Sequence, residues 1–268
     1  MSILVWDAIG EHIYETGTKK GVLYPQAAGG SYPLGVAWNG LTGFSASPEG
    51  GDPNDIYADD IKYLALRGVE NFNGTITAYT YPDEWAECDG SATLVPGVTI
   101  GQQPRKTFGF SCVTTIGNDT ELDGYGYKIH LVWGASASPS ERSYQTINDS
   151  PEPIEFSWEI TTVPVSVTGH KPTAHMEIDS TKLSSAALTA LEAALYGTEN
   201  TAPYLPSPDQ VLAIITGNSK TYTYELVSSP TGNPSTSDYY VRMGNDYIKS
   251  TDTSVVSGTS YYTREEVT

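Results

Sequence analysis

Histidine and acidic side chains lie close together in one short stretch of the sequence. His170 and His175 precede Glu177 and Asp179, so four residues of metal-binding type fall within ten positions. Imidazole nitrogens and carboxylate oxygens are common ligands of zinc. In a strand, however, the apolar residues between them would point inward and leave His175, Glu177 and Asp179 on a solvated face. We therefore favour a polar strand face over a metal site.

A second cluster of acidic residues lies in the segment 45–60. It consists of Glu49, Asp52, Asp55, Asp59 and Asp60. The spacing does not fit a calcium-binding loop, because Ile56 stands where an oxygen ligand is required. The segment is rich in Gly and Pro and has too little apolar surface to bury itself in its own domain. We expect a long polar loop that becomes ordered against a partner.

Sequence motifs of common enzymes are absent. The chain has no GxSxG motif, no phosphate-binding or dinucleotide-binding glycine pattern and no cysteine pair with zinc spacing. A pair of carboxylates could cleave glycosides, but some pair is expected by chance among 32 acidic residues. Trp38, Trp133 and Trp158 occupy apolar strand positions, so we expect them in the core instead of stacked on sugars. The sequence predicts no catalytic residue, no metal and no cofactor.

The net charge of the chain is −18, from 32 acidic and 14 basic residues. Proteins that hold nucleic acid need a basic surface, so ordinary DNA or RNA binding is disfavoured. The first residues lack the basic region and apolar run of a signal peptide, which leads us to expect free thiols at Cys88 and Cys112 in a reducing cytoplasm. No apolar run approaches the roughly 20 residues of a membrane-spanning helix, so no membrane partner is expected.

Alternation of apolar and polar residues predicts antiparallel strands with one solvated face. The runs lie at residues 75–81, 107–112, 125–133 and 154–161. Residues 34–38 form another candidate strand, closed by a tight turn at Asn39-Gly40, whereas the rest of the first 60 residues reads as loop with short extended pieces. The expected fold class is mainly β: an antiparallel sandwich or barrel.

One segment has helical periodicity. Leucines at 183, 188, 191 and 195 share a helix face, Ser180 or Thr181 is a plausible N-cap, and Gly197 stands at the expected end. The sequence therefore predicts one flanking α-helix at about 182–196. Val211–Ile215 is interpreted as the last strand of the main domain.

The composition changes near residue 218 to one rich in Ser, Thr and Tyr. A short repeat, Tyr-Tyr-x-Arg, occurs at residues 239 and 261. We predict two domains: a main β domain at 1–217 and a small β-rich module at 218–268.

Seven short stretches have sequences that are more distinctive than the alternation or composition of a general β protein. They are PRKTFGFS (104–111), IGND (116–119), GYKIHLVWGA (126–135), ASPSERSY (137–144), INDSPE (147–152), FSWE (156–159) and LPSPDQV (205–211). Together they resemble the major tail tube proteins of siphoviruses, the long non-contractile-tailed bacteriophages, of Gram-positive hosts. The resemblance covers about residues 30–216.

The resemblance implies a structural virion protein of the phage tail with no enzymatic activity. Six copies would close into a ring, and rings would stack into a tube around a tape-measure protein. The tube would meet tail terminator and distal tail proteins, and genomic DNA would pass through it only as cargo. The chain would occupy the host cytoplasm during assembly. The 45–60 loop, with its five acidic residues, would reach the adjacent ring.

Two other interpretations remain open. One is a carbohydrate-binding or glycan-cleaving β-sandwich that acts as a receptor-binding protein, and the other is a capsid or neck protein. The module at 218–268 departs from the family pattern, in which chains often end near residue 215. It is interpreted as surface decoration, a host-adhesion module or a spacer.

Overall fold

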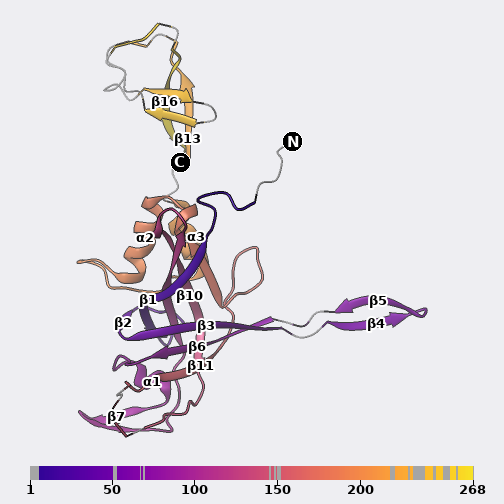
Figure 1. Ribbon diagram of the computed structural model, residues 1–268, viewed down its shortest axis with the longest axis vertical. Coiled ribbons are helices and arrows are strands. Elements are labelled where there is room, and N and C mark those ends of the chain that lie inside the picture. The colour runs from indigo at the N-terminus through magenta and orange to yellow at the C-terminus, as the bar shows by residue number, and fades with distance from the viewer. Residues whose placement is uncertain are drawn as a thin grey trace. The chain divides into compact units, whose positions relative to one another are not determined.

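A computed structural model describes residues 6–50, 53–66, 68, 70–144, 146–147, 149, 152–217, 221–228, 230–231, 239–243, 246–249, 254–257 and 259–267. The chain forms two compact units, Met1–Ile215 and Thr216–Thr268 (Figure 1). The division lies close to the boundary expected after residue 217.

The first unit is mainly β, as the sequence predicted. Its main sheet contains β1 (Tyr14–Pro25), β2 (Val36–Trp38), β3 (Leu41–Gly50), β6 (Glu70–Ala78), β9 (Phe108–Asn118), β10 (Leu122–Ala137), β11 (Phe156–Thr162) and β12 (His175–Asp179). Two separate hairpins are formed by β4 (Asn54–Ala58) with β5 (Ile61–Leu66), and by β7 (Ala92–Val95) with β8 (Val98–Ile100). The helices are α1 (Trp85–Asp89), α2 (Ser185–Tyr196) and α3 (Pro208–Gly217), and Ser180–Lys182 forms a 3₁₀ turn.

The main sheet is antiparallel and curls back on itself. Its strands follow the order β2-β1-β9-β10-β11-β6-β3, with β12 also paired to β10. β2 and β3 stand at opposite ends of this order, yet only the Asn39-Gly40 turn separates them in the chain. The two ends of the sheet must therefore meet, which gives a sandwich-like or barrel-like unit.

Inside the curl lies a cluster that we call the inner core. It consists of Leu23, Trp38, Ile76, Ala78, Trp85, Cys88, Phe108, Phe110, Cys112, Val132, Ala135, Ala137, Trp158 and Ile160. Trp38, Trp85 and Trp158 contact one another, with ring centroids 4.7–5.6 Å apart. Both cysteines are free thiols in this core, and burial raises the pKa of each to about 12.

The opposite face of the central strands forms a second cluster, the outer core. It consists of Val22, Tyr24, Tyr32, Val113, Ile129, Leu131, Trp133, Ile178, Leu191, Leu195, Leu205 and Val211. The expectation of one solvated face per strand is therefore wrong for β9 and β10, where residues 108–113 and 129–135 are all buried. Small residues make this possible: a Cβ at Gly109 would lie 2.3 Å from Leu205 Cδ2.

Two hydrogen bonds fix the helical layer to the outer face. The Tyr24 hydroxyl donates to the Leu195 carbonyl at 2.8 Å, and Trp133 Nε1 donates to the Pro206 carbonyl at 2.9 Å. These aromatic residues satisfy their polar atoms while their rings remain buried. The β sheet and the segment 195–206 are thereby joined into one packed unit.

The predicted helix is confirmed as α2, but its N-cap is Ser184, whose Oγ accepts from the Ala187 amide at 3.2 Å. The predicted N-caps, Ser180 and Thr181, lie in the separate 3₁₀ turn. Gly197 ends the helix as expected.

The prediction of a strand at Val211–Ile215 is wrong, because these residues belong to α3. Ser207 and Gln210 form a capping box: the Ser207 amide donates to Gln210 Oε1, and the Gln210 amide donates to Ser207 Oγ. Pro208 occupies the first turn, where proline is tolerated. This local signal outweighs the β-favouring residues that follow.

The prediction of loop over most of the first 60 residues is also wrong. β1 is a long strand, β3 pairs with β6 as far as Gly50↔Glu70, and β4 pairs with β5. Asp59 and Asp60 both have positive φ, at 52° and 62°, as the central residues of a tight hairpin turn do. Asp tolerates this conformation, which allows an acidic turn to replace the expected loop.

The second unit contains β13 (Thr221–Leu226), β14 (Tyr240–Met243), β15 (Asp246–Lys249) and β16 (Tyr261–Val267). They form an antiparallel sheet in the order β13-β16-β14-β15. The two Tyr-Tyr-x-Arg segments meet on neighbouring strands, with Tyr240 opposite Tyr262. None of the described helices combines the length and apolar character needed to cross a bilayer.

A substitution at Gly134 tests how the long strand β10 is bent. Gly134 has φ +62°, and an added Cβ would lie 2.2 Å from the Val163 carbonyl oxygen. We expect Gly134→Ala to lower the free energy of unfolding by about 3 kcal/mol or more, from backbone strain and the clash. Gly29→Ala is the control, because a Cβ added at Gly29 would have no atom within 4 Å. Denaturant titrations that give both variants equal stability would contradict this account.

Candidate assembly surface

The β4–β5 hairpin exposes apolar side chains without packing on the core of its unit. Tyr57, Ile61 and Tyr63 are 64–67% exposed, and the only residue of either strand that is not exposed is Asp55. Figure 1 shows the hairpin as a separate ribbon beyond β3 and β6. Two-stranded hairpins alone are marginally stable in water, and clustered exposed apolar residues are typical of interaction sites.

The five acidic residues predicted to contact a neighbouring ring do not form one cluster. Glu49 lies on β3 and accepts from Asn73 Nδ2 at 3.0 Å, whereas Asp55 lies on β4 and pairs with Lys62 at 2.7 Å. Asp59 and Asp60 form the tip of the hairpin. Asp52 lies outside the described residues. The acidic groups are thus spread from the base of the hairpin to its turn.

The composition of this segment indicates its polar character but not the exposure of its apolar residues. Four apolar residues of β5 are exposed: Ile61, Tyr63, Leu64 and Leu66. The alternation of apolar and polar residues does not reveal this exposure, because the exposure of a strand depends on whether another layer of the protein covers it. The sequence does carry a signal for the hairpin. Two apolar segments, Ile56-Tyr57 and 61–66, flank the turn-forming pair Asp59-Asp60.

The β7–β8 hairpin presents a second surface of the same kind. Leu94, Val95, Val98 and Ile100 are 37–63% exposed. The unit therefore carries two apolar hairpins whose side chains are not covered by its own core.

Four of the five tryptophans are packed in the cores of the first unit. Trp38, Trp133 and Trp158 are buried, as predicted, and so is Trp85. Buried indoles cannot stack on a saccharide, so these four residues offer no carbohydrate platform.

The histidine cluster differs from the one that sequence spacing suggested. His175 and Glu177 lie beside His130, while His170 is exposed and Asp179 bonds instead to Thr181 and Lys182. Burial lowers the pKa of His130, and burial together with the charge of His130 lowers the pKa of His175 to about 4. His175 is half-buried, not fully on a solvated face as predicted, because its ring stacks on Phe72 at 4.5 Å.

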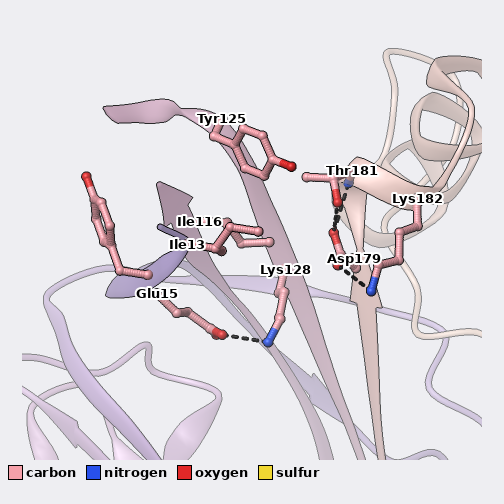
Figure 2. A pocket seen from close by; sticks show the side chains of 9 residues that line it. Ile13, Glu15, Ile116, Tyr125, Lys128, Asp179, Thr181 and Lys182 are labelled. Carbon is pink, nitrogen blue, oxygen red and sulfur yellow. Dashed lines mark hydrogen bonds and ion pairs between the residues drawn. The ribbon is translucent and has the colours of Figure 1, made fainter. Parts of the chain in front are cut away.

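A pocket of about 390 Å³ lies between β1, β10 and the 3₁₀ turn (Figure 2). Its charged side chains are paired: Lys128 Nζ lies 2.6 Å from Glu15 Oε2, and Lys182 Nζ lies 3.3 Å from Asp179 Oδ2. Figure 2 shows both pairs along the pocket wall. Carboxylates that are neutralised by lysine in this way are poorly placed for acid–base chemistry.

No protein-family model matches the sequence, and no curated protein is significantly similar to it.

The exposure of the hairpin predicts that its apolar side chains contribute nothing to the stability of the isolated chain. The double variant Ile61→Ser/Tyr63→Ser should keep its free energy of unfolding within about 0.5 kcal/mol of wild type. Ile76→Ser on β6, a fully buried position in the inner core, should cost about 3 kcal/mol or more. Denaturant titration of dilute protein measures both. A large loss in the hairpin variant would mean that the hairpin packs on its own unit.

Proposed function

We propose that this protein is a structural subunit that self-assembles into stacked, hexameric rings and forms the tail tube of a siphophage. The observation that carries the proposal is the β4–β5 hairpin, which leaves apolar side chains exposed on a unit whose cores are otherwise well packed. Such a surface is stabilised when a neighbouring copy covers it.

The edges of the sheet support assembly in a ring. β3 pairs with β6 and with no other described strand, so one of its edges can accept a strand from another copy. Closing edges against neighbours removes the unpaired backbone groups that otherwise promote aggregation. The acidic hairpin tip and apolar flanks would then contact the adjacent ring.

The resemblance to tail tube proteins supports the proposal independently. Two of its stretches, 137–144 and 156–159, contain Arg142 and Trp158, which both interact with the buried Asp89. The guanidinium of Arg142 also lies over the rings of Tyr81 and Phe156, 5.5 and 5.8 Å from their centroids. Arg142 thus fastens the segment after β10 to α1, as a structural motif would.

The charge fits a conduit for DNA. A ring of six copies would carry six times the net charge of −18. A share of that charge on the inner wall would repel phosphate groups and let DNA slide past. The tape-measure protein would fill the channel during assembly, and the terminator and distal tail proteins would contact the two ends.

Self-assembly is tested directly with the purified full-length chain. Sedimentation velocity over increasing concentration should show rings and longer polymers, and negative-stain images should show a central hole. A compact monomer at every concentration would overturn the proposal.

Removal of the hairpin separates ring formation from stacking. Replacing residues 53–67 with a short Gly-Ser linker should leave the fold intact, because β3 and β6 remain paired up to Gly50↔Glu70. We expect rings without elongated tubes. The Ile61→Ser/Tyr63→Ser variant should show the same defect in milder form, as shorter tubes. Tubes of normal length from both variants would rule out the hairpin as the stacking element.

Truncation after Gly217 tests the role of the second unit. α3 ends at this residue, and the sheet of the second unit begins at Thr221. The shortened chain should be soluble and should form the same rings, as expected of a decoration or spacer. Loss of solubility or of rings would show that the second unit takes part in assembly.

A further inference from the structure

A row of polar side chains crosses four neighbouring strands on one face of the main sheet. It runs from Glu15 on β1 through Thr114 on β9 and His130 on β10 to His175 and Glu177 on β12. In the β10–β12 ladder His130 lies directly opposite Glu177, and His175 is two residues away on the same side of its strand. Pairing of strands thus brings together two histidines that are 45 positions apart in the sequence.

Three ligand atoms in this row converge. His130 Nδ1 lies 3.4 Å from His175 Nε2 and 3.9 Å from Glu177 Oε1, and the ligand atoms of the three residues all lie within 4.8 Å of one another. Two nitrogens that bind one tetrahedral zinc ion at roughly 2.0–2.1 Å are themselves roughly 3.4 Å apart. A direct hydrogen bond between the two histidines would be long at 3.4 Å. The distance between the two nitrogens therefore suits a shared metal ion better than a hydrogen bond.

The other ring nitrogen of His130, Nε2, is hydrogen-bonded in the way that is common for metal-binding histidines. Thr114 Oγ1 donates to Glu15 Oε1 at 2.5 Å, so at the 3.0 Å contact with His130 the same oxygen must accept a hydrogen bond from the Nε2–H group. This fixes the tautomer and leaves the lone pair of Nδ1 facing His175 and Glu177. Metal-binding histidines are commonly oriented by such a relay to a carboxylate.

The surroundings hold the ligands in place and favour a divalent cation. Phe72 stacks on His175 with centroids 4.5 Å apart, and the two imidazole rings are parallel, with an interplanar angle of 2°. His130 is buried while Glu177 is exposed, so an ion can enter from the Glu177 side. The charged neighbours are Glu15, Glu177 and Lys128, and their sum of −1 offsets part of the charge of the ion.

We propose that His130, His175 and Glu177 bind a divalent transition-metal ion, with Zn²⁺ as the best match and water as its fourth ligand. Two imidazoles and one carboxylate are a known donor set for zinc with an open position. The site does not depend on the proposed function, because all its ligands come from one chain.

Calorimetric titration of the EDTA-treated, dialysed full-length protein with ZnCl₂ tests the proposal. We expect one ion per chain and a rise in melting temperature, with no comparable effect of MgCl₂. Glu177→Gln, an exposed position that should fold normally, and His175→Asn should each weaken Zn²⁺ binding at least tenfold. Glu15→Gln, which acts through Thr114, should weaken it by about 10–100-fold.

His170→Asn is the matched control, because His170 is exposed and lies outside the cluster. It should bind Zn²⁺ like wild type. The proposal is overturned if Zn²⁺ gives no more heat than Mg²⁺, or if Glu177→Gln and His175→Asn bind as tightly as His170→Asn. In that case the two imidazoles share only a hydrogen bond.

Discussion

The contact among Trp38, Trp85 and Trp158 is the interaction on which the rest of the main unit depends. Trp38 comes from the edge strand β2, Trp158 from β11 near the other end of the strand order, and Trp85 from α1. Their mutual tilted and edge-on geometry is the favoured one for aromatic pairs. These rings fill the curl of the sheet and hold its two ends together. With the sheet curled in this way, the opposite face of β9 and β10 is free to receive the helices.

The curled sheet also sets where the outer features lie. β3 and β6 leave the inner core as a paired ladder, and the chain continues from them into the β4–β5 hairpin. The row of polar side chains that ends in the histidine cluster lies on the paired strands β1, β9, β10 and β12. A proposed assembly surface and a proposed metal site thus share one scaffold, although neither requires the other.

Much of this fold was predictable from local patterns. The strands around residues 108–112 and 154–160 and the helix ending at Gly197 follow from periodicity and stop signals. The β-favouring side chains at 211–215 predict a strand, but the Ser207–Gln210 capping box begins a helix there instead. The burial of both faces of β9 was not predictable from the sequence. It depends on Leu205, which is distant in the chain and packs against Gly109.

The candidate sites were predictable to a lesser degree. The segment 45–60 stood out by composition, but its hairpin form depends on Asp59 and Asp60 adopting a left-handed conformation. Spacing paired His175 with His170, whereas the structure pairs it with His130, because strand register and not sequence distance determines neighbours. The sequence pattern thus predicts which types of residue form the cluster, but not which histidines belong to it.

Hydrogen–deuterium exchange of the β4–β5 amides, compared between dilute monomer and assembled protein, tests the central claim most directly. Ordering of the hairpin by a neighbouring copy predicts rapid exchange at residues 54–66 in the monomer and at least about 100-fold slower exchange after assembly. The amides of β9 and β10 serve as the reference and should exchange slowly in both states. Hairpin amides that exchange equally fast before and after assembly would contradict the account.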